Sequence, residues 1–366
     1  MTTISFPGLG IGEFELDPIA IHFGDNGGIR WYALCIVIGM ILAVIYTAYR
    51  SKGEGVKFDT VLDFAIFTIP IGIIGTRLYY VFFDWLSAVV NGQPSPYQSF
   101  TDVIAIWNGG LAIYGGIIFG GITIVVVAKV KKISRNGLLK ILDSVAPGVM
   151  IAQALGRWGN FFNGEAYGSP TALPWRMCSD SFTSRLYRLG LINRDTAYQM
   201  LDGTLGVHPT FLYESLWNIL GFVLINILYK KKRFDGQILL MYISWYGFGR
   251  MFIELLRTDS LTTGVDIRVS SLLGLLSFIV AGSLLLYLFI KNKGNKPYGS
   301  GVVLATAVNG EATEGSDENT NGESEATEVN ETEESQDPQE NIEDTENTEN
   351  TEITESKEEE NDGTVD

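Results

Sequence analysis

Long apolar runs recur along the first 290 residues of this 366-residue chain. Seven of them reach the length of roughly 17–25 residues that a transmembrane helix needs. They predict helices at 31–49, 61–83, 111–128, 141–158, 211–229, 237–256 and 269–290. The first, third and seventh runs contain no charged residue, whereas each of the other four carries at least one. The pattern predicts an all-α polytopic membrane protein with about seven transmembrane helices.

The segments between the runs define the predicted organisation. Residues 1–30 are polar and mixed, with Gly, Pro and Asp in turn-like clusters, and 84–107 is predicted to be a loop. Residues 160–209 are too polar to span a membrane and predict a small headpiece of short helices. We therefore expect an N-terminal segment at 1–30, a seven-helix domain at 31–290 that includes this headpiece, and a tail at 291–366.

Basic residues predict the orientation of the chain. Lysine and arginine cluster after the first, third, fifth and seventh runs, whereas 84–107, after the second, has neither. Short basic loops mark the cytoplasmic side of a membrane protein. The N-terminus and headpiece are therefore expected outside the membrane and the C-terminal tail in the cytoplasm. No basic region or cleavage site of a secretory signal peptide is found at the N-terminus.

The net charge of −16 comes from the tail alone. Residues 301–366 hold 23 acidic residues and one lysine, while the other 300 residues hold 25 basic and 19 acidic ones. The tail repeats Glu, Thr and Asn and has too few apolar residues to bury a core, so we expect it to be disordered. The acidity therefore says nothing about the membrane domain, which is mildly basic.

The stretch 156–168, with the sequence GRWGNFFNGEAYG, ends the fourth run with one arginine, two asparagines, one glutamate and four glycines. A charge at the bilayer centre costs roughly 2.5 kcal/mol or more, so one that persists usually faces a partner, a ligand or water. Glycines allow tight turns and the close approach of a ligand. The stretch predicts an anion-binding pocket at a membrane surface. The alternative is a glycine-rich loop whose arginine reaches the lipid headgroups.

Three arginines lie toward the outer ends of predicted helices and one glutamate near the outer start of another: Arg77, Arg157, Arg250 and Glu214. We expect them to converge on one outer-leaflet cavity, where the planar fork of arginine suits phosphate. The alternative is that Arg77 pairs with Asp84 and that Arg250 pairs with Glu254, four residues later, as structural ion pairs.

The remaining candidates are few. His208, in a loop before the fifth run, is either structural or an acid or base that titrates near neutral pH. The glycine pairs at 109–110 and 115–116 are typical of helix packing. The alternative is that they open the backbone so that a lipid can pass. Neither a P-loop nor a zinc signature occurs, and Cys35 and Cys178 suggest no disulfide and no metal site. We therefore expect no metal and no cofactor.

Six motifs in order resemble the prolipoprotein diacylglyceryl transferase family over about 19–291. They are IRWYAL at 29–34, GTRLYYV at 75–81, WNGGLAIYGG at 107–116, DSVAPGVMIAQALGRWGNFFNGEAYG at 143–168, HPTFLYES at 208–215 and YGFGRMFIELLRTDS at 246–260. The number and order of the motifs make the resemblance specific. The acidic tail lies outside it.

The resemblance implies transfer of a diacylglyceryl group from phosphatidylglycerol to the lipobox cysteine of a bacterial prolipoprotein. A thioether forms and glycerol phosphate is released. It implies a multi-pass protein of the bacterial cell (plasma or inner) membrane, with phosphatidylglycerol and prolipoprotein signal peptides as partners and no nucleic acid. The substrate-binding set that we predict is Arg157, Tyr32, Asn160, Asn163, Gly168, Arg77, Tyr246 and Glu254.

The resemblance also implies that Arg157 and Arg250 handle the phosphate. Family members can carry a histidine, considered a base, before the GG that here follows Tyr114, so a histidine base is in doubt at that place. The thiol must become a thiolate to react. The base is left open among His208, Tyr114 and Glu165, or the field of the arginines lowers the pKa of the thiol.

Intramembrane charges also mark transport paths, so a lipid or anion transporter is the alternative function. We find no inverted repeat of the kind that many transporters carry. Dependence of lipid transfer on a peptide cysteine separates the two functions.

Overall fold

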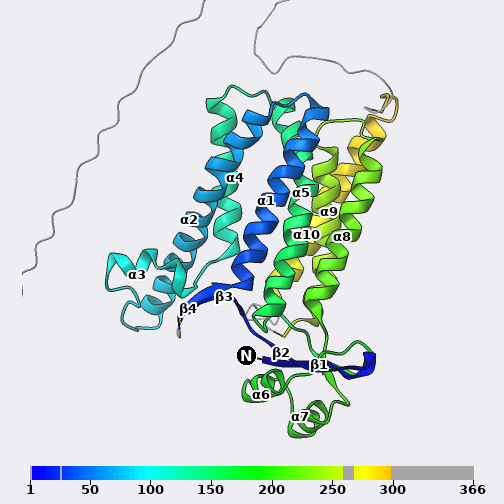
Figure 1. Ribbon diagram of the computed structural model, residues 1–366. Coiled ribbons are helices and arrows are strands. Elements are labelled where there is room, and N and C mark those ends of the chain that lie inside the picture. The colour runs from blue at the N-terminus through cyan, green and yellow to red at the C-terminus, as the bar shows by residue number, and fades with distance from the viewer. Residues whose placement is uncertain (1, 25–26, 259–267, 298–366) are drawn as a thin grey trace, which may run out of the picture. The chain divides into compact units, whose positions relative to one another are not determined.

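The computed structural model describes residues 2–24, 27–258 and 268–297. All of them belong to the first of the two units into which the chain divides, Met1–Ala312; the second unit, Thr313–Asp366, and most of the predicted tail lie outside the described residues. Long helices dominate the described part (Figure 1). They are α1 (Trp31–Ser51), α2 (Phe58–Val90), α4 (Ile113–Val130), α5 (Arg135–Phe162), α8 (Thr210–Tyr229), α9 (Gln237–Leu256) and α10 (Val269–Lys291).

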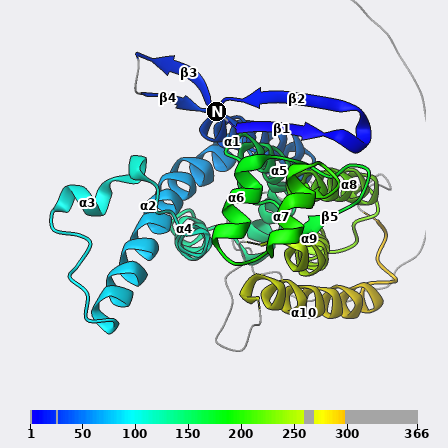
Figure 2. The same ribbon diagram turned by 90° about the horizontal axis from the view of Figure 1, so that it is seen from below.

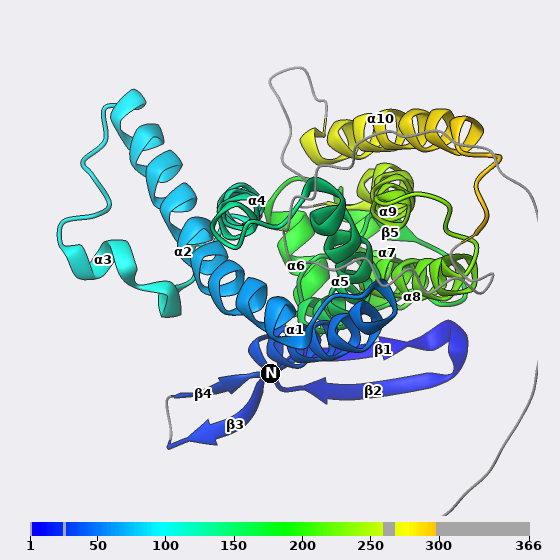
Figure 3. The ribbon, with the colours of Figure 1, turned by 90° about the horizontal axis from the view of Figure 1, so that it is seen from above.

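All of these except α9 are long and apolar enough to cross a membrane, which gives six candidate spans in the described residues. Helix α9 carries Arg250 and Glu254, and it packs against α5, α8 and α10. In Figure 3, α10 lies on the side of α9 that faces away from α5. The chain is therefore a polytopic helical membrane protein, and the seventh crossing, by α9, stays a prediction.

Two helices, α2 and α5, extend several residues beyond their predicted bounds, whereas the bounds of the other long helices agree within two residues. Helix α5 starts at Arg135 rather than 141, because the Ser134 side chain accepts a hydrogen bond from the Gly137 backbone N–H at 3.1 Å and caps the helix. Helix α2 has 33 residues, a length of about 50 Å at 1.5 Å per residue, which exceeds the roughly 30 Å of a hydrocarbon core.

The prediction of a loop over 84–107 is wrong in part. Helix α2 continues to Val90, and the segment also contains α3 (Phe100–Ile104) and the start of η3 (Ile106–Asn108). Ser99 and Asp102 form a reciprocal capping box that starts α3. Figure 3 shows α2 running away from the other helices toward α3.

Two helix pairs approach closely at glycines. A Cβ added to Gly115 in α4 would lie 2.1 Å from the Gly75 carbonyl oxygen of α2, and one added to Gly247 in α9 would lie 2.6 Å from the Gly274 carbonyl oxygen of α10. In each pair the two helix backbones can touch only because both contacting residues are glycines, which have no side chain. The packing interpretation of the glycine pair at 115–116 is therefore confirmed for Gly115.

The N-terminal segment contains strands that the sequence did not predict. Strands β1 (Thr2–Phe6) and β2 (Ile11–Leu16) form one antiparallel hairpin around η1 (Pro7–Leu9), and β3 (Ile19–Phe23) and β4 (Gly27–Arg30) form another. The backbone of Ser5 in β1 exchanges hydrogen bonds of 3.0 and 2.9 Å with Cys178 of the headpiece. The first hairpin is thus part of the headpiece.

The headpiece contains the short helices α6 (Asp180–Arg188) and α7 (Arg194–Leu201) and the short strands β5 (Pro170–Thr171) and β6 (Gly206–Val207). Its core joins the N-terminal hairpin to these elements, and its most buried members include Ile4, Phe182, Leu186 and Val207. Figures 1 and 2 show α6 and α7 across the end of the bundle at which α5 ends and α8 begins. The headpiece therefore covers the end of the bundle that carries the glycine-rich stretch.

A buried lysine joins three elements at the opposite end of the bundle. Lys232, between α8 and α9, has no exposed surface. Its Nζ lies 2.8 Å from Glu54 of η2 (Lys52–Glu54), 3.0 Å from Asp143 of α5 and 3.3 Å from Asp235. Burial opposes the charge of Lys232, but Asp143 and Glu54 outweigh that effect and raise the pKa of the amine. We call this group the Lys232 cluster.

Candidate active site

The carboxylate of Glu214, in the second turn of α8, bridges two arginines from different helices. Its Oε1 accepts a hydrogen bond from Nη2 of Arg157 at 2.7 Å and another from Nη1 of Arg250 at 2.9 Å. The glutamate side chain is 3% exposed, and the arginine side chains are 20% and 15% exposed, so the group is enclosed but reachable. Two of the three predicted arginines and the glutamate therefore converge.

Further polar contacts extend this group on both sides. On the α5 side, Nη1 of Arg157 donates to Oδ1 of Asn160 at 3.2 Å. Nδ2 of Asn160 in turn donates to Oε1 of Glu165 at 3.0 Å, and Nδ2 of Asn163 donates to the same oxygen at 3.2 Å. The glycine-rich stretch thus places both asparagines on one carboxylate next to Arg157.

The α9 side begins at Arg250, whose Nη2 lies 2.6 Å from Oε2 of Glu254, as the alternative of an i, i+4 pair predicted. Arg257 approaches the same oxygen at 3.9 Å, and the Arg268 guanidinium donates to the Glu254 backbone carbonyl. Arg250 therefore joins both carboxylates and takes part in the structural pair as well as in the shared site.

Each guanidinium carries five N–H donors. The bonds described above engage only the two Nη atoms of Arg157 and of Arg250. Other N–H groups on both forks remain for an anion. We call Arg157, Arg250, Glu214 and Glu254 the arginine cluster.

Two predicted tyrosines lie close to the arginine cluster. The Tyr246 hydroxyl, one helical turn before Arg250, lies within electrostatic range of Glu214 and of both cluster arginines. Tyr32, at the start of α1, lies within range of Glu165 and Arg157. A Cβ added to Gly159 would lie 2.9 Å from the Tyr32 ring, so the glycine lets that ring lie against α5.

Gly168 joins the glycine-rich stretch to the ends of two helices. Its backbone N–H donates to the His208 carbonyl at 2.9 Å, and the next residue, Ser169, donates to the Leu256 carbonyl at 2.7 Å. A Cβ at position 168 would lie 2.7 Å from the His208 Cβ and 2.9 Å from the Leu256 oxygen. Glycine is required there because the segments that contain His208 and Leu256 leave no room for a side chain.

Arg77 does not belong to the arginine cluster, contrary to the predicted convergence of three arginines. Its guanidinium donates at 2.7–3.0 Å to four backbone carbonyls, those of Asp102, Val103, Gly109 and Gly110. The predicted pairing with Asp84 is also not found among the described ion pairs; that carboxylate accepts the Tyr97 hydroxyl at 2.8 Å. Arg77 fastens the segment around α3 to α2.

Tyr114 and His208 also lie outside the hydrogen bonds described for the arginine cluster. Tyr114, at the start of α4, has its ring centroid 6.3 Å from that of Tyr79. Nδ1 of His208 is 3.2 Å from the hydroxyl of Tyr213, which also accepts the Trp175 indole N–H at 2.6 Å. Burial lowers the pKa of His208, so its ring is neutral at pH 7.

Sequence reasoning placed Glu214 near the site but did not include it in the predicted site set, and it gave no role to Arg257 or Arg268. A glutamate near the predicted outer start of a membrane helix was the available signal for Glu214. The other two arginines follow α9 or precede α10, where nothing in the pattern distinguishes them from ordinary flanking charges. No group of three potential metal ligands occurs within the described residues.

Comparison with known proteins follows the same motifs. The family model of prolipoprotein diacylglyceryl transferase matches residues 18–287. A phosphatidylglycerol–prolipoprotein diacylglyceryl transferase of Streptococcus pneumoniae (strain JJA) is 45% identical over 287 residues, covering 77% of this chain and 97% of the relative. The protein of the same name in Streptococcus uberis (strain ATCC BAA-854 / 0140J) is 41% identical over 283 residues, covering 76% and 97%.

Proposed function

The chain belongs to the prolipoprotein diacylglyceryl transferase family, and from this premise we propose that the arginine cluster binds and activates the phosphate of phosphatidylglycerol. The protein is a membrane transferase that moves the diacylglyceryl group of phosphatidylglycerol to prolipoproteins, the first step of lipoprotein maturation. The transporter alternative is not favoured, because the relatives are named as transferases.

The acceptor in this proposal is the thiol of the lipobox cysteine in the prolipoprotein signal peptide. Its sulfur attacks the glyceryl carbon that carries the phosphate, so a carbon–sulfur bond forms while the carbon–oxygen bond to phosphate breaks. The thiol proton passes to a base, and glycerol phosphate leaves with the electron pair. The protein's Cys35 and Cys178 take no part, because the reacting thiol belongs to the substrate.

The observation that carries the proposal is the sharing of Glu214 by Arg157 and Arg250. As the phosphodiester becomes a monoester, negative charge grows on the departing phosphate oxygen. Preformed donors in an enclosed site stabilise such growing charge, and the loss of one typically costs about 3–4 kcal/mol of transition-state stabilisation. Glu214 holds both forks in place before the lipid arrives, so little reorganisation is needed during the reaction.

The remaining predicted site residues have supporting roles in this proposal. Asn160 and Asn163 fix Glu165, Tyr246 and Tyr32 line the arginine cluster, and Glu254 orients Arg250. Glu165 is the candidate base that hydrogen bonds join to the cluster, through Asn160. We therefore assign Glu165 to receive the thiol proton, ahead of His208 and Tyr114.

We place the protein in the bacterial cell membrane with its N-terminus and headpiece outside and its tail in the cytoplasm. The support is the distribution of basic loops, together with the position of the headpiece at the end of the bundle where α8 begins, away from the basic segment that follows α8 (Figure 1). A cysteine introduced at Lys231 should resist an impermeant thiol reagent applied to intact cells. Labelling from outside would contradict this orientation.

The function is tested by incubating the purified protein in vesicles with labelled phosphatidylglycerol and a lipobox peptide. We expect label on the peptide through a thioether and release of glycerol phosphate. A peptide in which the cysteine is replaced by serine is the control and should remain unlabelled. Movement of labelled lipid across the vesicle membrane without peptide labelling would support the transporter instead.

A further inference from the structure

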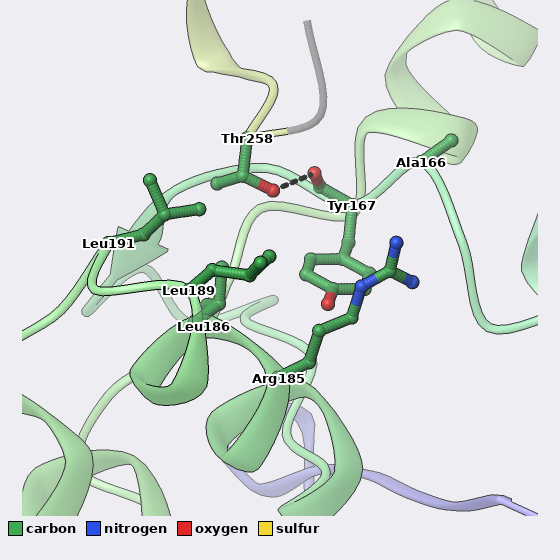
Figure 4. A pocket seen from close by; sticks show the side chains of 7 residues that line it. All are labelled: Ala166, Tyr167, Arg185, Leu186, Leu189, Leu191 and Thr258. Atoms are coloured by element: carbon green, nitrogen blue, oxygen red, sulfur yellow. Dashed lines mark hydrogen bonds between the residues drawn. The ribbon is translucent and has the colours of Figure 1, made fainter. Parts of the chain in front are cut away.

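A small pocket lies between the headpiece and the end of α9 (Figure 4). Its volume is about 180 Å³. Its lining comes from α6 and the loop after it, from the glycine-rich stretch and from the residue that follows Arg257: Ala166, Tyr167, Arg185, Leu186, Leu189, Leu191 and Thr258. The Thr258 hydroxyl donates to the Tyr167 carbonyl at 3.2 Å and closes one side.

Two series of polar contacts, which we call the two arms of the arginine cluster, run from its arginines to residues next to this pocket. On one side, polar contacts run from Arg157 through Asn160 to Glu165, and Ala166, the next residue, lines the pocket. On the other side, they run from Arg250 through Glu254 to Arg257, and Thr258, the next residue, lines it.

Glu214 contacts both Arg157 and Arg250, so the two arms are also joined at the end away from the pocket. The arginine cluster and the pocket lining are therefore connected along two routes. An occupant of the pocket would therefore lie beside the segments that hold both arginines.

The chemistry of the lining limits what the pocket can bind. Three leucines, an alanine and the Tyr167 ring make it largely apolar, and Figure 4 shows the Arg185 side chain extending beside that ring. Within the described residues the Arg185 guanidinium has no hydrogen-bond or ion-pair partner, and the described lining contains no carboxylate. The pocket therefore suits an apolar group that has a hydrogen-bond acceptor next to it.

The size of the pocket favours a peptide over a lipid. Pockets for drug-sized ligands occupy roughly 300–1,000 Å³, so 180 Å³ accommodates a side chain rather than a whole acyl chain. An apolar side chain beside its own main-chain carbonyl provides both features. Leu189 and Leu191 are 61% and 51% exposed, which leaves the pocket open to a chain approaching from outside.

We propose that this pocket receives an apolar side chain of the prolipoprotein next to the reacting cysteine, and that Arg185 donates to the adjacent main-chain carbonyl. The proposal rests on the proposed transferase function and names the part of the enzyme that selects the acceptor peptide. Binding there holds the peptide against the segments that carry the arginine cluster, and so brings its thiol toward the lipid phosphate.

The test is steady-state kinetics with the full-length protein in vesicles, varying the lipobox peptide at fixed phosphatidylglycerol and then the reverse. Replacing Leu189 and Leu191 together by asparagine should raise the KM for the peptide by roughly tenfold or more, the scale of lost apolar contacts in a binding pocket. The KM for phosphatidylglycerol should not change. Leu201→Asn is the matched control, since Leu201 is 53% exposed on α7 and does not line the pocket.

A second pair of variants tests the rim. Arg185→Gln should raise the peptide KM, whereas Arg188→Gln, on the same helix but outside the lining, should not. A peptide with glycine in place of the apolar residues beside its cysteine should bind the wild-type protein more weakly. It should lose little further when it meets the double leucine variant, because the contact is already absent.

Unchanged peptide KM in the double variant, with an active wild-type protein, would overturn the pocket proposal. A rise in the KM for phosphatidylglycerol alone would overturn it too, since it would identify a lipid site. If the wild-type protein labels no peptide, it is the transferase function that fails. Melting temperatures equal to that of the wild type establish that the variants are folded.

Discussion

Glu214 fixes the relative positions of the two cluster arginines, because one of its oxygens accepts hydrogen bonds from both. Because Glu214 and Glu254 already balance the charge of the two arginines, the affinity of the pair for another anion comes from the N–H donors that these contacts leave unused. The bond lengths of 2.7 and 2.9 Å are those of charge-assisted hydrogen bonds. At this scale the proposed phosphate site is an arginine pair that is already oriented without a bound anion.

The geometry predicts that lysine cannot replace either arginine. Arg157→Lys keeps the charge but cannot donate to Glu214, Asn160 and a phosphate through a planar fork. Turnover should fall by about 100-fold or more, as in other sites that lose one preformed donor, while the KM for phosphatidylglycerol changes less. The measurement is peptide labelling at saturating lipid.

Arg250→Lys should lose turnover in the same way, but Arg250 also pairs with Glu254. Glu254→Gln is therefore the comparison. If both variants lose activity together with thermal stability, the role of Arg250 is structural. An active, correctly inserted Arg157→Lys protein would contradict the bidentate role of Arg157.

The His208 ring predicts a dependence of stability on pH. Burial lowers its pKa in the folded protein, so the unfolded chain, with a histidine pKa of about 6.5, binds the proton first on acidification. The contribution of this group is present above that pH and is lost as the pH falls below it. The melting temperature of wild-type protein should fall more steeply between about pH 7 and 5 than that of His208→Asn.

The same variant tests the assignment of the base. We expect His208→Asn to keep the acid limb of the pH profile of kcat/KM, since in the proposed mechanism Glu165 receives the proton. Loss of that limb would instead assign the base to His208.

At the scale of elements, the segment around α3 depends on Arg77. Four backbone carbonyls, two from α3 and two from the glycine pair at 109–110, converge on one guanidinium that projects from α2. A Cβ at Gly110 would lie 2.6 Å from its Nη1. Hydrogen bonds to charged groups contribute about 1.5–3 kcal/mol each. This arginine therefore orders a stretch that has little packing of its own.

Arg77→Lys should loosen that stretch, because an ammonium group cannot reach all four carbonyls. We expect faster protease cleavage within 91–110 and little change in the melting of the whole protein. Limited proteolysis followed by mass spectrometry measures the difference, with Arg188→Lys in the exposed part of α6 as the control. Equal cleavage rates at 91–110 would show that other contacts hold the segment.

The long helices could be predicted from sequence because each apolar run is too long to be a strand or a loop. The glycine-rich stretch was found for a similar reason, since its charges are costly where they lie. Arg77 was misplaced because its partners are backbone carbonyls, which every residue carries and no pattern reveals. The bridging role of Glu214 depends on contacts across 57 and 36 positions, which only the folded chain brings together.

At the scale of the whole molecule, the two ends of the bundle are held by different means. One end is covered by the headpiece and its apolar core, whereas the opposite end is joined by the Lys232 cluster. Asp143 strengthens the latter by also accepting the backbone N–H groups of Gly236 and Leu239 at 2.7 and 2.8 Å. Charge pairing in the Lys232 cluster therefore stabilises its end of the bundle, as apolar packing does at the end that carries the headpiece.

Removing the lysine should destabilise the protein strongly. Lys232→Ala leaves buried carboxylates without their cation, and breaking a buried charge pair costs about 3–5 kcal/mol. Chemical unfolding in detergent micelles measures the loss, and Lys231→Ala, at an exposed neighbouring position, is the control. Equal stability of the two variants would contradict the role given to the cluster.

The acidic tail should be dispensable for catalysis. Residues 308–366, outside the described part of the chain, have too few apolar residues to dock on the bundle. A protein truncated before 308 should label the lipobox peptide at a rate within about twofold of the full chain at equal expression, since surface changes away from a site have small effects. A large loss of turnover would show that the tail acts in the reaction.

The position of Lys232 in the chain has a consequence for biogenesis. Glu54 is made 178 residues before the lysine that pairs with it, an interval of roughly 10–40 s at ordinary rates of synthesis. During this time the helices that precede α8 reside in the membrane with Glu54 and Asp143 unpaired. Arg157 is likewise made before its partner Glu214, which follows 57 residues later. Both partners arrive with α8, one near its start and one just after its end. Arg250 and Glu254 follow in α9, so the arginine cluster is complete only when that helix joins the bundle.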